Sequence, residues 1–576
     1  MIPITGEIEM SEENLQQQEM PEFSGNELFQ QRVRKVEEIT AAGINPFGER
    51  FDGDTRISQI RENYRPDDEA PQHVIAAGRM TAMRVMGKSI FADVRDSSGR
   101  MQFFVGKNEV GEENFAFIKK LDIGDIIGVE GDLFVTRTGE LTIRTSKLTL
   151  LCKSLRPLPE KFHGLTDVEQ RYRQRYLDLI TNDASREVFQ KRCRIISELR
   201  RFMESRGFME VETPMLQHLA GGASANPFKT FYEAINSPMF MRIAPELFLK
   251  RLLVGGFERV FEINRNFLAD RGFMEVETPM LQPLAGGASA TPFTTFYEAL
   301  NSNVYMRIAP ELYLKRLLVG GFEKVFELNR SFRNEGVDRR HNPEFTMLEL
   351  YQAYSDCRGM MELIETMIST IALKVCGTTK IDHGNGKIID LTPPFRRATY
   401  HELCKEKGGD DWFDITPAER VERGQKLGLD VNSSMSDLDV TNELYEKLVE
   451  PNNIQPTFVT RLPAQLLPLA NPCADDPSLV DVFELGINGM EIAPAYSELN
   501  DPIIQRQRFM EQFEQNKEEG DKVSDKVDED VLTAREYGMP PAGGMGVGID
   551  RLVIILTGAE SIRDVILFPQ MRNISR

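Results

Sequence analysis

The sequence lacks long apolar runs and is poor in cysteine. None of its segments approaches the roughly 20 continuous apolar residues that a membrane-spanning helix needs. The first 20 residues are acidic and rich in glutamine, which is not the pattern of a secretory signal peptide. Six cysteines without a CxxC pair argue against a disulfide scaffold and against a structural zinc site. We therefore expect a cytoplasmic protein whose cysteines are reduced.

Positive charge is also in deficit. The chain of 576 residues has 69 Lys+Arg against 89 Asp+Glu, a formal net charge of −20. This balance argues against non-specific coating of nucleic acid, although a local basic face would still bind it. With 41% hydrophobic and 27% charged residues, the composition is that of a folded globular protein with several domains.

The hydrophobic pattern changes along the chain. A polar tail over 1–25 is expected to be disordered, and helical spacing of apolar residues predicts a helix over 26–42. Five short alternating runs between 73 and 152 predict a small closed β-barrel. After a proline-containing linker, a long amphipathic helix over 186–207 opens an α+β body, which ends in a glycine-rich strand-to-helix junction over 543–556.

An internal repeat is the most unusual feature of the sequence. Residues 202–266 and 267–331 align at an offset of 65, with 51 identical positions. GFMEVETPML, RIAPEL and LKRLLVGGFE each occur in both segments. Two such similar copies inside one body indicate a tandem duplication of part of a domain rather than a solenoid.

Three ordered motifs carry a family resemblance. The first is the long helix that leads to Glu212-Thr-Pro214; the second is Phe332-Arg-Asn-Glu335 followed by His341-Asn-Pro-Glu-Phe345; the third is Gly544-x-Gly-x-Gly-x-Asp-Arg551. With these motifs behind a small barrel, the chain from about residue 26 resembles the class II aminoacyl-tRNA synthetases, and among them the bacterial lysyl type.

The resemblance implies an α+β fold with an N-terminal OB-fold barrel and a class II catalytic domain built on an antiparallel sheet. The implied organisation is a tail (1–25), a helical extension (26–72), an anticodon-binding OB-fold (73–154), a linker (155–185) and the catalytic domain with both repeats (186–576). It also implies a homodimer, with lysine, ATP and tRNA(Lys) as substrates.

Amino-acid activation requires a carboxylate to attack the α-phosphate of ATP, so the site needs fixed positive charge and a platform for the base. The resemblance assigns catalytic roles to Arg333 and Arg551, because a planar, always-charged guanidinium suits carboxylate and phosphate. It assigns Glu335, His341 and Phe345 to ATP, with Phe345 stacking on adenine. Glu484 and Glu491 match metal-binding carboxylates, whose oxygens suit Mg²⁺.

Selection of lysine needs buried negative charge for an ammonium group. The resemblance places Glu311 and Glu498 there, with the hydroxyl of Tyr351, the wall of Tyr496 and room for the α-amino end at Gly287. Glu311 also follows Pro310, as a first-turn helix residue commonly does. In the barrel, Phe91 matches a residue that stacks on an anticodon base and Gln102 one that reads a base edge.

The repeat creates a conflict, because one sheet has one place for each strand. We expect the second copy to complete the catalytic domain, since it runs on into Arg333, and the first copy to be displaced. An alternative keeps 209–212 beside its helix and extrudes about 65 residues as a loop.

Two other functions stay open at this point. The duplication could have left a catalytically impaired pseudo-synthetase or tRNA-binding protein, or the chain could be an aspartyl- or asparaginyl-type enzyme. Negative charge at Glu311 and Glu498 argues against the latter, because those substrates carry acidic or amide side chains.

Overall fold

The computed structural model describes residues 27–53, 55–66, 70–159, 167–218, 227–242, 244–262, 273–288, 290–467, 470–518 and 528–570. The expected tail over 1–25 therefore lies outside the described residues. Within the described part, no helix is long and apolar enough to cross a membrane.

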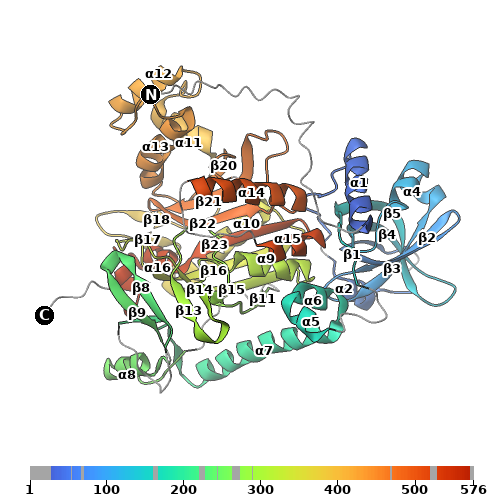
Figure 1. Cartoon of the computed structure of the whole chain (residues 1–576), viewed down its shortest axis with the longest axis horizontal. Helices are drawn as coiled ribbons and strands as arrows, with labels where there is room; N and C mark the ends of the chain where they lie inside the picture. Colours follow the sequence, from blue (N-terminus) through green and yellow to red (C-terminus); the bar gives the residue numbers. More distant parts are fainter. Residues whose placement is uncertain are drawn as a thin grey trace.

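The N-terminal part is a closed barrel of five strands in the order β1-β2-β3-β5-β4. The strands coincide with the predicted alternating runs: β1 (His73–Met86), β2 (Ser89–Arg95), β3 (Arg100–Gly106), β4 (Ile126–Val135) and β5 (Leu141–Cys152). Helix α1 (Glu27–Ala41) and helix α2 (Ile57–Asn63) pack on the barrel, and α3 (Lys107–Val110) and α4 (Glu112–Ile118) join β3 to β4. The barrel lies to one side of the molecule (Figure 1).

The segment after the barrel is helical. Helix α5 (Val168–Arg173) and helix α6 (Arg175–Thr181) occupy part of the predicted linker, and α6 buries Tyr176, Leu177, Leu179 and Ile180 against the body. The long predicted helix is α7 (Asp183–Ser205), which begins three residues earlier than expected because the Asn182 side chain accepts a hydrogen bond from the Ser185 amide. It runs along the lower edge of the molecule in Figure 1.

An eight-stranded sheet forms the centre of the body, in the order β11-β15-β16-β23-β22-β21-β20-β19. Neighbouring strands are antiparallel except at the two edges, where β11 pairs with β15 and β19 pairs with β20 in parallel. The strands are β11 (Met274–Glu275), β15 (Lys324–Phe332), β16 (Glu344–Ala353), β19 (Arg396–Thr399), β20 (Thr457–Pro463), β21 (Leu479–Ile487), β22 (Met490–Ser497) and β23 (Ala542–Gly548).

One face of this sheet carries the main hydrophobic core. Phe326, Leu348, Leu350, Met545 and Val547 point to that side and pack with helices α10 (Cys357–Ile371) and α16 (Ile549–Thr557). Side chains alternate along a strand, so the intervening residues of the same strands share the other face. Phe345 and the three glycines of the third motif lie on that second face.

Helices and short strands complete the body. The remaining helices are α11 (Tyr400–Gly408), α12 (Pro417–Lys426), α13 (Asp437–Leu444), α14 (Pro502–Glu518), α15 (Glu529–Glu536) and α17 (Ile562–Val565). Helices α11 to α13 pack around the buried Trp412 beside β20. The strands β17 (Lys380–Asp382) and β18 (Ile388–Asp390) form a separate hairpin.

The two similar segments fold alike. The first module (208–262) contains β6 (Met209–Glu210), β7 (Leu216–Gln217), β8 (Lys229–Tyr232), β9 (Ser237–Met241), α8 (Glu246–Val254) and β10 (Val260–Phe261). The second module (273–327) contains β11, β12 (Leu281–Gln282), β13 (Thr294–Tyr297), β14 (Ser302–Met306), α9 (Glu311–Val319) and the start of β15. Arg242 pairs with Glu262 in the first module as Arg307 pairs with Glu327 in the second, both at 2.7 Å.

Only the second module contributes strands to the large sheet. Its β11 and β15 form one edge of that sheet, whereas β6 pairs with β10 in a separate two-stranded sheet. The expected placement of the second copy is thus confirmed. The first module is folded over its described residues and lies beside the second (Figure 1), so it is not an extruded loop.

Candidate active site

Three glycines on β23 leave part of one sheet face, near its middle, without side chains. Gly544, Gly546 and Gly548 pair with Tyr351, Glu349 and Met347 of β16, so all three alternate onto the face opposite the hydrophobic core. Phe345 lies on this face of β16 as well, two residues before Met347. The glycines of the third motif and strand β16, which carries the end of the second motif, therefore line the same face of the sheet.

A cluster of acidic side chains lies beside Gly544, at one end of this row of glycines. Glu311 begins α9, and Glu498 follows β22. The ammonium of Lys315, one turn along α9, lies 2.5 Å from a carboxylate oxygen of each. Burial alone would lower the pKa of Lys315, but these two carboxylates raise it above its usual value, so the ammonium stays charged.

Glu349 belongs to the same acidic cluster, and the sequence reasoning missed it. It is buried on β16, and the Tyr351 hydroxyl donates a 3.4 Å hydrogen bond to its carboxylate. Burial, together with Glu311 and Glu327, raises the pKa of Glu349 to about 8. Among the described residues, Glu349 forms no ion pair. The sequence could have indicated Glu349, because it lies two residues before Tyr351 on a strand and such residues share one face of the sheet.

Glycines leave space beside this acidic cluster. A Cβ added at Gly544 would lie 2.0 Å from Glu498 Oε1 and 2.5 Å from the Tyr351 ring. Tyr351, Gly544 and Tyr496 form one row across β16, β23 and β22. Gly287, with φ +92°, lies against Ala309, two residues before Glu311. The structure thus brings together all five residues predicted for the lysine pocket.

Arg333 and Phe345 form a second cluster beside the pocket. Arg333 follows β15, and its guanidinium carbon lies 5.2 Å from the centre of the Phe345 ring. Its main-chain amide donates to the Pro343 carbonyl at 2.9 Å, which closes the loop between β15 and β16. The buried Nε of Arg333 has no hydrogen-bond partner among the described residues, so a donor is left for a bound anion.

His341 and Arg551 meet at the far side of that loop. Arg551 donates one hydrogen bond to the Glu491 carbonyl at 2.8 Å and another to His341 Nε2 at 2.9 Å. His341 Nδ1 in turn donates to Asp338 at 2.7 Å. These hydrogen bonds connect the second motif to the third. Glu335 is exposed, and its main-chain carbonyl accepts from the Tyr232 hydroxyl at 3.2 Å.

Glu484 and Glu491 lie on the antiparallel strands β21 and β22, whose turn is Asn488-Gly489 with positive φ at both residues. With Glu450 they line a cavity of about 290 Å³. Burial, reinforced by Glu491 and Glu450, raises the pKa of Glu484 to about 8. No group of three or more metal-binding side chains is recognised in the described part of the chain. Two carboxylates with phosphate oxygens are nevertheless a donor set that Mg²⁺ accepts.

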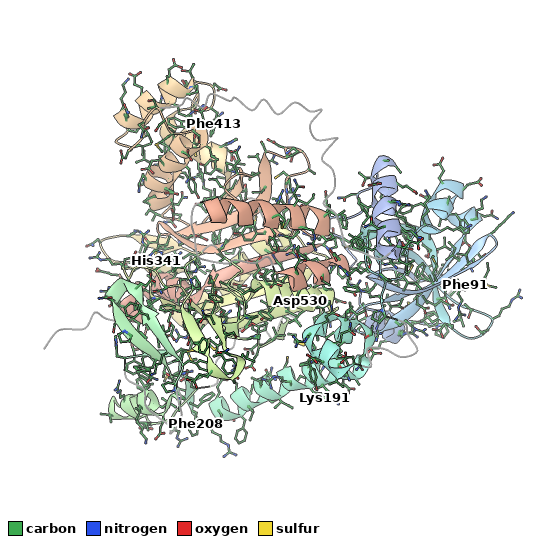
Figure 2. The ribbon with its side chains drawn as sticks, in the orientation of Figure 1. Phe91, Lys191, Phe208, His341, Phe413 and Asp530 are labelled. Atoms are coloured by element: carbon green, nitrogen blue, oxygen red, sulfur yellow. The ribbon has the colours of Figure 1, made fainter. Side chains whose placement is uncertain are left out.

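The barrel presents a row of aromatic rings. Phe91 and Phe104 face each other across β2 and β3 with ring centres 5.0 Å apart, and Phe134 lies 6.2 Å beyond Phe104. The Gln102 side chain accepts a hydrogen bond from Thr142 at 3.1 Å. Phe91 in the barrel and His341 at the sheet lie on opposite sides of the molecule (Figure 2).

Comparison with known families identifies the fold and the class. The family model described as tRNA synthetases class II (D, K and N) matches residues 167–269 and 264–572, and the OB-fold nucleic acid binding domain model matches 74–151. The chain therefore belongs to the class II tRNA synthetases. The predicted order of OB-fold barrel and class II catalytic domain is confirmed.

Individual relatives within this class are lysine–tRNA ligases. The chain is 46% identical over 550 residues to the lysine–tRNA ligase of Pelotomaculum thermopropionicum, covering 95% of each chain. It is 45% identical over 552 residues to that of Syntrophomonas wolfei, and 43% identical over 556 residues to that of Staphylococcus saprophyticus. These alignments span 96% and 95% of this chain and 98% and 99% of the relatives.

Proposed function

We propose that this chain is a lysine–tRNA ligase, which activates lysine with ATP and transfers it to tRNA(Lys). The observation that carries the choice of amino acid is Glu349, a buried carboxylate without an ion-pair partner among the described residues. The ammonium group of a bound lysine would provide this carboxylate with an ion-pair partner. The side chains of aspartate and asparagine offer no positive charge, so they would leave Glu349 unmatched.

The remaining pocket residues would hold the rest of the amino acid. Lys315 fixes the carboxylates of Glu311 and Glu498 in place, and the Tyr351 hydroxyl holds that of Glu349. A pocket held in this way is preorganised, so little reorganisation accompanies binding. Tyr496 would form a wall, and Gly287 would leave space for the α-amino end.

The two arginines would act on the phosphates. The lysine carboxylate attacks the α-phosphorus of ATP, pyrophosphate leaves, and lysyl-adenylate forms; a terminal hydroxyl of tRNA then attacks the acyl carbon and AMP leaves. Arg333 would bridge the carboxylate and the α-phosphate through its free donor, while Phe345 supports the adenine. Arg551 and His341 would bind the leaving end of the triphosphate, and Glu335 would contact the nucleotide from the same loop.

We also propose that Glu484 and Glu491 bind Mg²⁺ together with the phosphates, with Glu450 nearby. A bound Mg²⁺ would neutralise phosphate charge and orient pyrophosphate as a leaving group. In the barrel, Phe91 would stack on an anticodon base and Gln102 would read a base edge. We place the reaction in the cytoplasm, where these substrates meet.

A homodimer is part of the proposal. Helix α7 exposes Val188, Ile195, Leu199 and Phe202, which recur at helical spacing and are 49–61% exposed. An exposed apolar stripe of this kind supports contact with a second copy along α7.

The two modules are proposed to be a tandem duplication of one segment. Their 51 identical positions, their matching elements and the restart of the family match at residue 264 support this origin.

Steady-state charging of tRNA(Lys) with lysine tests the function. We expect Glu349→Gln to raise the KM for lysine and Arg333→Lys to lower kcat by about 10²–10³-fold. Glu362→Gln, an exposed change on α10, serves as the matched control. Charging with aspartate or asparagine in place of lysine would contradict the proposal, as would a Glu349→Gln variant that behaves like the control.

A further inference from the structure

A small cavity lies where the barrel meets the body, beside α6 (Figure 1). Its volume is about 40 Å³. One water molecule takes up about 30 Å³ in the liquid, so the cavity has room for little more than a water molecule or an ion of similar size. The barrel contributes Arg79, Thr81 and Arg95 to the lining, α7 contributes Arg186, and the turn after α9 contributes Gly320 and Gly321.

Two guanidinium groups of this lining are buried without an ion-pair partner among the described residues. Arg79 and Arg186 are each 8% exposed. Arg79 donates to four main-chain carbonyls at 2.6–3.1 Å, and Arg186 donates to the Leu179 carbonyl at 2.7 Å. Burial lowers the pKa of both groups, but an arginine is not deprotonated in proteins. Two positive charges are therefore fixed beside the cavity, and carbonyl dipoles do not neutralise them.

Hydrogen-bond donors around the cavity are also left unused. The buried Nε of Arg95, the buried Nε of Arg186 and the buried hydroxyl of Thr81 have no partner in the part of the chain that the structure describes. Arg95 pairs with the exposed Asp183, which does not satisfy its Nε. Buried polar atoms in proteins nearly always have a partner. A water molecule would accept from these donors but neutralise no charge, whereas an anion would do both.

Two carboxylates share the lining, and both are held by main-chain amides. Asp96 accepts from three amides at 2.7–2.8 Å, and Glu323 accepts from the Ser97 amide at 2.9 Å. Within the described ranges, neither forms an ion pair with Arg79 or Arg186. Burial raises the pKa of Glu323, which reduces the negative charge that it supplies. Positive charge therefore predominates at the cavity.

We propose that this cavity binds one small inorganic anion of the size of chloride, which accepts hydrogen bonds from Arg95 Nε, Arg186 Nε and the Thr81 hydroxyl. The anion would also balance the charge of Arg79. An amino acid or a nucleotide is too large for about 40 Å³, so this site is separate from the proposed lysine and ATP site. The inference does not rest on the proposed function.

The anion would strengthen the contact between barrel and body, because its ligands come from both. Thr81 and Arg95 belong to the barrel, and Arg186 belongs to α7. The Arg186 guanidinium also lies against the turn after α9, since a Cβ added at Gly321 would be 3.3 Å from its Nη2. Binding should therefore slow the local opening of this turn, whose amides report on the site.

Crystals of the full chain grown in sodium bromide test the site directly, because bromide substitutes for chloride and scatters anomalously. We expect an anomalous peak in the cavity, within hydrogen-bond reach of Arg95 Nε and Arg186 Nε. In solution, hydrogen exchange of the amides in 318–323 is compared in sodium chloride and sodium gluconate at equal ionic strength. Gluconate is too large for the cavity, so exchange should be at least about fivefold slower in chloride, with saturation.

Substitutions of the ligands link both measurements to the cavity. Arg186→Met should lose the bromide peak and the chloride dependence, although it also removes the contact with α6. Thr81→Val removes only the hydroxyl, and it should raise the chloride concentration for half-maximal protection by about three- to tenfold. Arg34→Gln, an exposed change on α1 of the same part of the molecule, is the matched control and should keep the wild-type response.

An empty anomalous map at the cavity overturns the proposal, because the cavity then holds water only. A bromide peak without saturable chloride dependence in solution overturns it as well, because the peak would then be an adventitious ion only. The same holds if Thr81→Val and Arg186→Met respond to chloride like Arg34→Gln, because the chloride effect would then arise elsewhere.

Discussion

At the scale of residues, the carboxylates of the candidate pocket are of two kinds. Glu311 and Glu498 share the ammonium of Lys315, which satisfies them within the protein. Glu349 receives only a tyrosine hydroxyl as a side-chain donor among the described residues, and burial keeps it protonated near neutral pH. We therefore expect Glu349 to lose its proton when the ammonium group of the substrate binds.

Lysine binding should depend on pH through Glu349. Its pKa of about 8 means that the neutral acid dominates below pH 8 and the carboxylate above it. Because an ammonium group needs the carboxylate, the KM for lysine should fall by about five- to tenfold from pH 7 to pH 8.5. Initial rates across this range measure it. In Glu349→Gln the KM should be higher and flat; a wild-type KM that rises with pH would contradict this account.

Gly544 should be intolerant of any side chain. A methyl group there meets Glu498 Oε1 and the Tyr351 ring, both of which are buried, so Gly544→Ala should displace the pocket and lower lysine-dependent ATP–pyrophosphate exchange by about 10²-fold. Gly546→Ala is the comparison on the same strand, because its nearest atom is the flexible end of Met347 at 2.7 Å. A loss at Gly546 as large as at Gly544 would count against the pocket.

At the scale of elements, periodicity predicted the five strands of the barrel and the glycine-rich strand before α16. The alternating runs of the barrel and the strand-to-helix junction at Gly548 depend on local pattern and turn residues, which the sequence displays. The Lys315 ion pairs could not be predicted in that way. They join α9 to the end of β22, and that pairing depends on how distant elements meet.

The barrel should serve tRNA and not amino-acid activation. If Phe91 stacks on a base, Phe91→Ala should weaken tRNA(Lys) binding by about 1–3 kcal/mol. Filter binding or fluorescence titration would measure this, with the exposed Leu28→Ala on α1 as the control. Equal affinities of the two variants would remove Phe91 from the binding surface.

At the scale of the whole molecule, the site is assembled from segments distant in the chain. Glu311 comes from the second module, Arg333 directly follows β15, Glu349 lies on β16, and Arg551 lies on α16. The resemblance carried by the ordered motifs predicted Glu311, Arg333 and Arg551 for this site, whereas Glu349 was missed. The position of the first module was not predicted, because near-identical segments carry the same local signals and only competition for one sheet separates them.

Deleting 202–266 should leave a working site. The deletion joins Arg201 to Phe267, the counterpart of Phe202, and removes none of the proposed substrate-binding residues. Lysine-dependent exchange should persist, with a KM for ATP raised several-fold because the contacts to Asn334 are lost. Complete loss of exchange in a folded deletion variant would show that the first module belongs to the site.

The most direct test of the central claim is ATP–pyrophosphate exchange by the purified full-length chain with lysine, aspartate or asparagine as the only amino acid. The account predicts exchange with lysine and none above background with the other two, because only lysine brings an ammonium to Glu349. Exchange that is driven by aspartate or asparagine, or no exchange with lysine, would contradict it.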